Sequence, residues 1–181
     1  MIPDSTFSLV IVFLLIGAQW LMRPSVFFRA ARIIFWSLIF GALFLSSYLT
    51  YEQYQLWRAH PLSQFLLPPH QSVGYFISYS AVNFFLPIAI NLLLATLVLL
   101  LSILVNKRSK GRYFEPAESY LAGAAILLSG SAWPVLLLML GGVAFIGSVM
   151  NLLARRGRFS LYYFWLPVCV SAILISRIAS L

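Results

Sequence analysis

Residues able to carry acid–base chemistry are few, because the 181-residue chain contains only four carboxylates. They are Asp4, Glu52, Glu115 and Glu118. Glu115 and Glu118 are three positions apart, and residues at that spacing lie on one face of a helix. Two carboxylates held close together can share a proton and serve as general acid and general base. Glu118, together with Glu115, is therefore the candidate catalytic pair.

The same two glutamates also fit a structural role at the start of a helix. In the sequence Glu115-Pro116-Ala117-Glu118, proline suits the first helical position and Glu118 suits the third. A carboxylate at the third position reaches back to an unpaired backbone amide and is stabilised by the positive end of the helix dipole. The surroundings of Glu118 distinguish the two roles. A second carboxylate on another helix favours catalysis, and a cap without one favours structure.

Other chemistry finds little support in the sequence. His60 and His70 lie in one proline-containing stretch where only Glu52 could join them, so we expect no metal site. Cys169 is the single cysteine, which excludes an intramolecular disulfide and a cysteine-based metal site. The sequence contains no Gly-x-Ser-x-Gly elbow, dinucleotide fingerprint or P-loop, so we expect no cofactor.

Composition points to a membrane protein. Hydrophobic residues make up 62% of the chain and charged residues 9%, whereas soluble domains have roughly 45–50% and 25%. The mean hydropathy is +0.95. At about 20 residues for each crossing, the chain has length for at most six or seven. We therefore predict an all-α, polytopic helical bundle of about six transmembrane segments, forming a single integral membrane domain over residues 1–181.

The apolar runs indicate where the crossings lie. The run at 73–105 exceeds one bilayer crossing, so we expect an interfacial portion followed by a span from about Phe84. The run at 120–153 is interrupted by turn residues from Ser129 to Pro134, which predicts a helical hairpin. Residues 50–72 contain three prolines and are expected to form the main extramembrane loop. The remaining runs are 7–22, 33–49 and 159–175.

Positive charges set the expected orientation. The net charge is +8, but the cations form short clusters between apolar runs, as the positive-inside rule requires, and do not indicate a nucleic-acid-binding face. Placing basic loops 23–32, 107–112 and 155–158 in the cytoplasm gives one consistent solution with six crossings and an outer N-terminus. The chain is thus expected to be multi-pass in the cell (cytoplasmic or inner) membrane.

Two further patterns concern packing. The aromatic run at 162–165 is typical of a membrane-interface belt. Small residues cluster along the second helix of the hairpin, and such a surface lets another helix approach closely. They are Gly141, Gly142, Ala144, Gly147 and Ser148.

The order of features in residues 111–175 matches a known family. Glu118 opens a Leu- and Ala-rich helix, Ser129-Gly130 forms a turn, Trp133-Pro134 opens the next helix, an arginine loop follows, and Pro167 lies in the last run. This third of the chain resembles the type IV prepilin peptidases, which are membrane aspartyl proteases with a Gly-x-Gly-Asp motif.

The signature of that family is incomplete here. Glu118 stands where the family has its second aspartate, and the glycines before it are absent. Ile2-Pro3-Asp4 is similar to the Ile-Pro-Asn that follows the first catalytic aspartate, which has no counterpart. The charge rule also places Asp4 on the opposite side of the membrane from Glu118. The resemblance therefore implies a divergent or degenerate relative.

Two functions follow as expectations. The resemblance implies a protein that engages the hydrophobic helix of a pilin-type partner and, if active, is an aspartyl-type peptidase using Glu118 and Glu115. The alternative is a small non-catalytic docking subunit of a larger membrane complex, packing through its small-residue surface. Transport is less favoured, since the spans offer few ionisable stepping stones.

Overall fold

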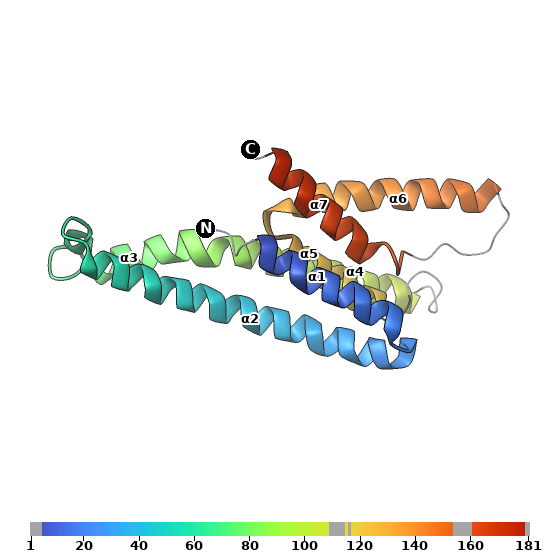
Figure 1. Ribbon diagram of the computed structural model, residues 1–181, viewed down its shortest axis with the longest axis horizontal. Coiled ribbons are helices and arrows are strands. Elements are labelled where there is room, and N and C mark those ends of the chain that lie inside the picture. The colour runs from blue at the N-terminus through green and yellow to red at the C-terminus, as the bar shows by residue number, and fades with distance from the viewer. Residues whose placement is uncertain (1–4, 109–114, 116, 154–160, 180–181) are drawn as a thin grey trace.

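The computed structural model describes residues 5–108, 115, 117–153 and 161–179, and every regular element within them is helical. The all-α helical bundle expected from composition is thereby confirmed. Figure 1 shows the helices running side by side along the long axis. The elements are α1 (Ser5–Leu21), α2 (Pro24–Ala59), η1 (Ser63–Leu66), α3 (Val73–Ser80), η2 (Ala81–Phe85), α4 (Leu86–Arg108), α5 (Glu118–Ser129), η3 (Gly130–Ala132), α6 (Trp133–Leu153) and α7 (Trp165–Ala179).

Helix α2 is longer than the sequence suggested. The apolar run at 33–49 was expected to lie between a basic loop at 23–32 and an outer loop at 50–72, but one helix of 36 residues, Pro24–Ala59, covers most of the first loop and the beginning of the second. Pro24 occupies its first turn, where a missing N–H costs nothing. No proline or glycine follows Gly41 until Pro61, and the helix ends at Ala59, with His60, the residue before that proline, as its C-cap.

Helix α3 continues into α4 through a π-helical turn. Residues Ala81–Phe85 form η2, and the Leu86 N–H donates to the Ala81 carbonyl, five residues back. Pro87 follows directly and lacks an N–H, and a proline ring clashes with the carbonyl four residues before it in a regular α-helix. The wider π turn relieves that clash. The predicted interfacial portion and the span from Phe84 are therefore one continuous helical segment.

The predicted hairpin is present. Helix α5 ends at Gly130, whose φ of 55° requires a residue without a side chain. Figure 1 shows the chain reversing there into α6, with Pro134 in the first turn of the new helix. Helix α7 follows, and Pro167 lies in its first turn, so no helical hydrogen bond is lost.

Helix α5 lies at the centre of the bundle. Ten of its 12 residues are buried, and it packs against α1, α2, α4 and α7. Gly123 makes the closest approach, because a Cβ atom built on it would lie 2.6 Å from Cε2 of Phe35 on α2. The small residues of α5 thus allow its neighbours to close around it. The core contains Val12, Phe27, Phe35, Ala95, Leu121, Ala125, Ile126, Leu136, Leu166 and Cys169.

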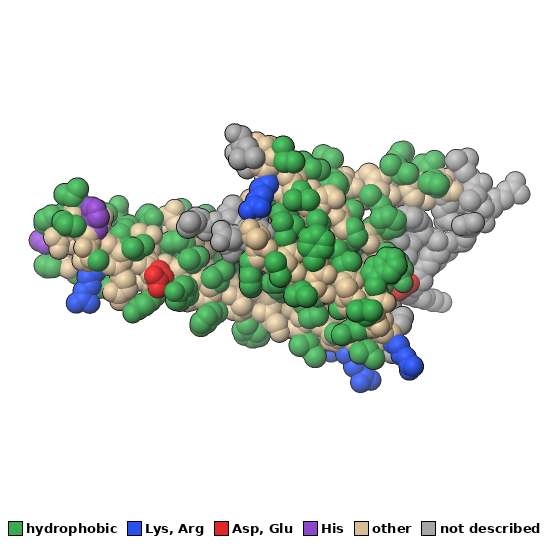
Figure 2. Space-filling model, viewed as in Figure 1, with side chains coloured by type: hydrophobic (Ala, Val, Ile, Leu, Met, Phe, Trp, Pro, Cys, Tyr) green, Lys and Arg blue, Asp and Glu red, His purple; other side chains and the backbone are tan. Residues whose placement is uncertain are grey.

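The surface is that of a membrane helical bundle. By length and composition, three helical segments could cross a bilayer, namely Val26–Ala59, Val73–Arg108 and Glu118–Met150, the last of which includes the reversal between α5 and α6. Two shorter apolar helices cover Thr6–Leu21 and Trp165–Ala179. In Figure 2, apolar side chains cover the flank of the molecule and the charged side chains lie mostly towards its ends. Exposed apolar residues include Phe13, Leu14, Phe40, Phe44, Leu93 and Leu138.

The described cations gather mainly at one end. Helices α2 and α5 begin, and α4 ends, at the same end of the bundle (Figure 1). This end, called the cationic end below, contains Arg23, Arg29 and Arg32 with Lys107 and Arg108. Helix α6 also ends there, at Leu153. The rest of the predicted cationic loops, residues 109–112 and 155–158, lies outside the described residues.

Candidate functional site

Glu118, the principal candidate from the sequence, is buried at the cationic end of α5. Its side chain is 1% exposed. Oε2 accepts a hydrogen bond from the backbone N–H of Glu115 at 3.1 Å, and Oε1 accepts one from Nε1–H of Trp165 at 3.2 Å. The first of these is the reach-back contact that the spacing of the two glutamates predicted. The predicted position differs, because α5 begins at Glu118 itself, which is therefore the first helical residue and not the third.

The Trp165 contact joins the start of α5 to the start of α7. Trp165 is buried, although it belongs to the aromatic run interpreted as an interface belt. Tyr162 from the same run is also buried, and its ring meets Phe27 of α2 edge-on at 6.1 Å between centroids. The belt interpretation is thus wrong for these two residues, because each has a partner inside the bundle. Tyr163 is exposed, as a belt residue would be.

A second hydrogen bond fixes this end of the bundle. Nε2–H of Gln19, near the end of α1, donates to the carbonyl of Tyr162 at 2.8 Å, and both groups are buried. Burial raises the pKa of the Tyr162 hydroxyl above its ordinary value of 10.0. The two hydrogen bonds, from Gln19 to Tyr162 and from Trp165 to Glu118, therefore tie the end of α1 and the start of α5 to the segment 162–165 at the beginning of α7. They are called the polar cluster below.

Among the described residues, no carboxylate from another helix lies next to Glu118. The ring centroids of Phe28 on α2 and Tyr120 on α5 are 6.0 Å apart, so these two residues lie at the same height along the bundle. Glu52 lies 24 positions beyond Phe28 on α2, or about 36 Å at 1.5 Å per residue. Glu115 is partly buried and precedes Glu118 in the same segment. Asp4 lies outside the described residues.

The two histidines lie at the tip of the α2–α3 hairpin, at the far end from Glu118 (Figure 2). The His60 Nδ1 accepts a hydrogen bond from the Leu62 N–H at 3.3 Å, and His70 meets the Phe65 ring at 4.8 Å. Within the described part of the chain, no three His, Cys, Asp or Glu residues come together as a metal site would need.

The small-residue surface of α6 is split between two faces. Gly147 is buried. Gly141 and Gly142 are exposed, and a Cβ atom built on either would have no neighbour within 4 Å. Ala144 is partly buried and Ser148 is exposed. The open part of this surface is therefore not used for packing between the described helices.

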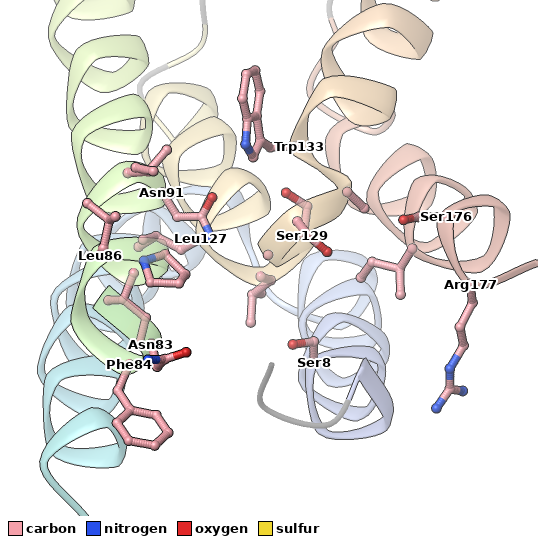
Figure 3. Close-up of a pocket in the computed structure, with 18 of the residues that line it drawn as sticks. Ser8, Asn83, Phe84, Leu86, Asn91, Leu127, Ser129, Trp133, Ser176 and Arg177 are labelled. Atoms are coloured by element: carbon pink, nitrogen blue, oxygen red, sulfur yellow. The ribbon is translucent and has the colours of Figure 1, made fainter. Parts of the chain in front are cut away.

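A cavity of about 720 Å³, lined mostly by apolar residues with several polar ones, lies beside the turn between α5 and α6, away from the cationic end, and the sequence did not indicate it. Figure 3 shows Asn83 and Asn91 on one wall, Ser129 and Trp133 on the facing wall, and Ser8, Ser176 and Arg177 along the rim. Its residues come from six α-helices (α1, α2, α4, α5, α6 and α7) and from η2 and η3. No spacing in the sequence joins them, so only the fold reveals the site.

Comparison of the chain with families of known proteins, with curated protein sequences and with solved structures found no match in any of the three.

Proposed function

We propose that the chain is a multi-pass membrane protein, organised like a prepilin peptidase without its catalytic chemistry, that engages apolar helices of pilin-type or other partner proteins inside the bilayer. One observation carries the non-catalytic part. Both carboxylate oxygens of Glu118 accept hydrogen bonds from groups of the fold, the Glu115 amide and the Trp165 indole. A group so placed stabilises a helix start and a helix pair.

Open space along α6 supports the engagement of a helix. Gly141 and Gly142 have no neighbour within 4 Å of a built Cβ atom. Such positions permit close contact between helix backbones, where van der Waals packing drives association in lipid. The alternative is a docking subunit of a larger complex that uses the same surface without any relation to pilins.

The proposed topology has six crossings, by α1, α2, the α3–α4 segment, α5, α6 and α7, with basic loops 23–32, 107–112 and 155–158 in the cytoplasm. The common location of the starts of α2 and α5 and the ends of α4 and α6 supports it. Single cysteines at Lys110, Arg156 and Leu62, treated with a membrane-impermeant maleimide, test it. Lys110→Cys and Arg156→Cys should react from one side and Leu62→Cys from the other. Reaction of the first two from opposite sides contradicts the topology.

Catalysis and engagement are tested in one membrane preparation. A leader-bearing pilin-type substrate is co-expressed with the wild-type chain or with Glu118→Gln, and its processing is followed by mass shift. No cleavage by either chain is expected. Cleavage by the wild type that Glu118→Gln abolishes would show an active peptidase, with Glu115 as the second candidate acid.

Engagement is measured by photo-crosslinking from α6 to the same substrate helix. Gly142→Leu should reduce crosslinking, because the added side chain blocks close approach. Gly41→Leu on α2 is the matched control, since Gly41 also has no neighbour within 4 Å and the substitution adds the same volume. Equal loss in both variants would contradict a specific surface on α6. Pull-down of a stable complex lacking any pilin-type protein would favour the docking subunit.

A further inference from the structure

The turn between α5 and α6 lies at membrane depth in the proposed topology. Helix α5 has 12 residues, which is about 18 Å, whereas the hydrocarbon core of a bilayer is about 30 Å thick. Because α5 starts at the cationic end, its far end at Ser129 stops short of the opposite bilayer surface. Helix α2, with 36 residues, and the α3–α4 segment continue past that level (Figure 1).

Two interrupted backbone segments border the same cavity. One is the turn, whose Gly130 and Ser131 line it. The other is the π-helical η2, whose Asn83 and Phe84 also line it. Pro87 follows η2 and has no N–H, so one carbonyl of this segment lacks the donor that a regular helix would supply.

Neither interrupted segment is fully buried in protein. Asn83 and Ser131 are exposed, and Gly130 is partly buried. At membrane depth, backbone that departs from a regular helix is tolerated only where protein buries it or where it lines a water-filled cavity. Burial does not apply to these residues, so the second condition points to water in the cavity.

Polar side chains offer further partners to water. Although most of the lining is apolar, Asn83 and Asn91 stand on one wall and Ser129 and Ser131 on the other. The carboxamide of Asn91 makes no hydrogen bond to any described residue, and it points into the cavity in Figure 3. Ordered water satisfies such groups, which are costly in lipid. The volume of about 720 Å³ far exceeds the roughly 10–15 Å³ that one water molecule needs.

A buried hydroxyl beside η2 also calls for water. The Ser80 side chain, one residue before η2, is 4% exposed, and its Oγ has no hydrogen-bond partner among the described residues. Buried polar atoms are rarely left without a partner, and ordered water commonly supplies one.

The cavity extends from the turn in the direction away from the cationic end. Gly123 of α5 packs against Phe35 of α2, which relates the heights of the two helices. From there α5 continues to Ser129, about 9 Å further, whereas Leu49 of α2 lies about 21 Å further. Leu49 lines the cavity, so the cavity reaches beyond the end of α5.

We propose that this cavity is a water-filled vestibule, open on the side opposite the cationic end, that brings the aqueous phase to the turn between α5 and α6. Water in the vestibule allows a helix as short as α5 to end inside the bilayer. The inference rests on the membrane topology proposed above, and it does not depend on the helix-engaging surface of α6.

The reactivity of single cysteines tests the vestibule. The full-length protein with Cys169→Ala, so that the introduced cysteine is the only thiol, is reconstituted in vesicles and treated from either side with a charged, membrane-impermeant methanethiosulfonate. Asn91→Cys and Ser131→Cys should react from the side opposite the cationic end, at least about tenfold faster than Leu93→Cys. The reactive form is the thiolate, which forms much less readily in apolar surroundings.

Leu93→Cys is the matched control. Leu93 lies two positions from Asn91 on α4, is 67% exposed and does not line the cavity. The two lining positions keep the test decisive if one variant does not fold. Reaction of both at the rate of Leu93→Cys would overturn the proposal. Reaction of both with a neutral, membrane-permeant maleimide alone would also overturn it, because the cavity would then contain lipid.

The side of reaction tests the opening. Reaction of Asn91→Cys and Ser131→Cys only from the cationic side would overturn the proposed vestibule. An error in the topology is recognised separately, because the sides from which Lys110→Cys and Leu62→Cys react do not depend on the cavity.

Discussion

Substitution of Gly123 by alanine is a sharp test of how α5 is held at the centre of the bundle. In an ordinary helix interior, glycine-to-alanine stabilises by up to about 1 kcal/mol. Here the added Cβ would lie 2.6 Å from Cε2 and 3.2 Å from Cδ2 of Phe35, and 3.4 Å from the Ala95 carbonyl oxygen. The Phe35 ring is 1% exposed and must withdraw within a packed core. Such overpacking costs about 1–3 kcal/mol, so a net loss of about 1–2 kcal/mol is expected.

The measurement is thermal unfolding of the purified protein in detergent, followed by loss of helical circular dichroism. Gly142→Ala is the matched control, because its Cβ would meet nothing within 4 Å and should stabilise the helix. A cycle with Phe35→Leu locates the effect, since Gly123→Ala should become neutral or stabilising once the ring is removed. If Gly123→Ala stabilises the protein as much as the control does, the close packing of α2 on α5 is refuted.

Further predictions concern the polar cluster and the buried thiol. Glu118→Gln and Trp165→Phe should each destabilise the fold by about 1–3 kcal/mol, because each leaves a buried group without its partner. The double variant should cost less than the two losses added, and additive losses in a thermal-unfolding cycle would exclude the coupling. Burial raises the pKa of Tyr162, so the folded chain keeps this proton above pH 10 while the unfolded chain releases it. Stability should therefore fall as the pH rises above 10, by less in Tyr162→Phe, and an identical pH profile for both chains would contradict the shift. Cys169 is buried with Sγ–H donating to the Ala125 carbonyl, so a maleimide should label it only in denaturant, and rapid labelling of the native protein would contradict its packing.

The sequence predicted those parts of the fold that local chemistry determines. Gly130 and Pro134 encode the turn between α5 and α6, because one permits a positive φ and the other suits a first helical turn. The reach-back of Glu118 to the Glu115 amide followed from their spacing. The helical class followed from composition, because only helices and closed barrels satisfy the backbone in lipid.

The extent of α2 and the cavity could not be predicted in this way. Hydropathy falls after Leu49, yet Glu52 and Arg58 are good helix formers, so the helix continues where the apolar run ends. The cavity joins Ser8 to Arg177 across nearly the whole chain. Trp165 resembled a membrane anchor in the sequence, and its role as a donor to Glu118 depends on how α7 packs against α5.

The π turn at Ala81–Phe85 determines which face of α3 is turned towards α2. It amounts to one extra residue in an α-helix, and each residue turns a helix by about 100°. The ring of Trp57 on α2 meets Tyr79 at 4.7 Å and Phe76 at 5.4 Å between centroids. Removing one residue from the turn would rotate these aromatic side chains by about a quarter of a circle, away from Trp57. The α2–α3 hairpin would then lose its aromatic contacts while the rest of the bundle retained its packing. The π turn therefore fixes the rotation of α3 relative to α2.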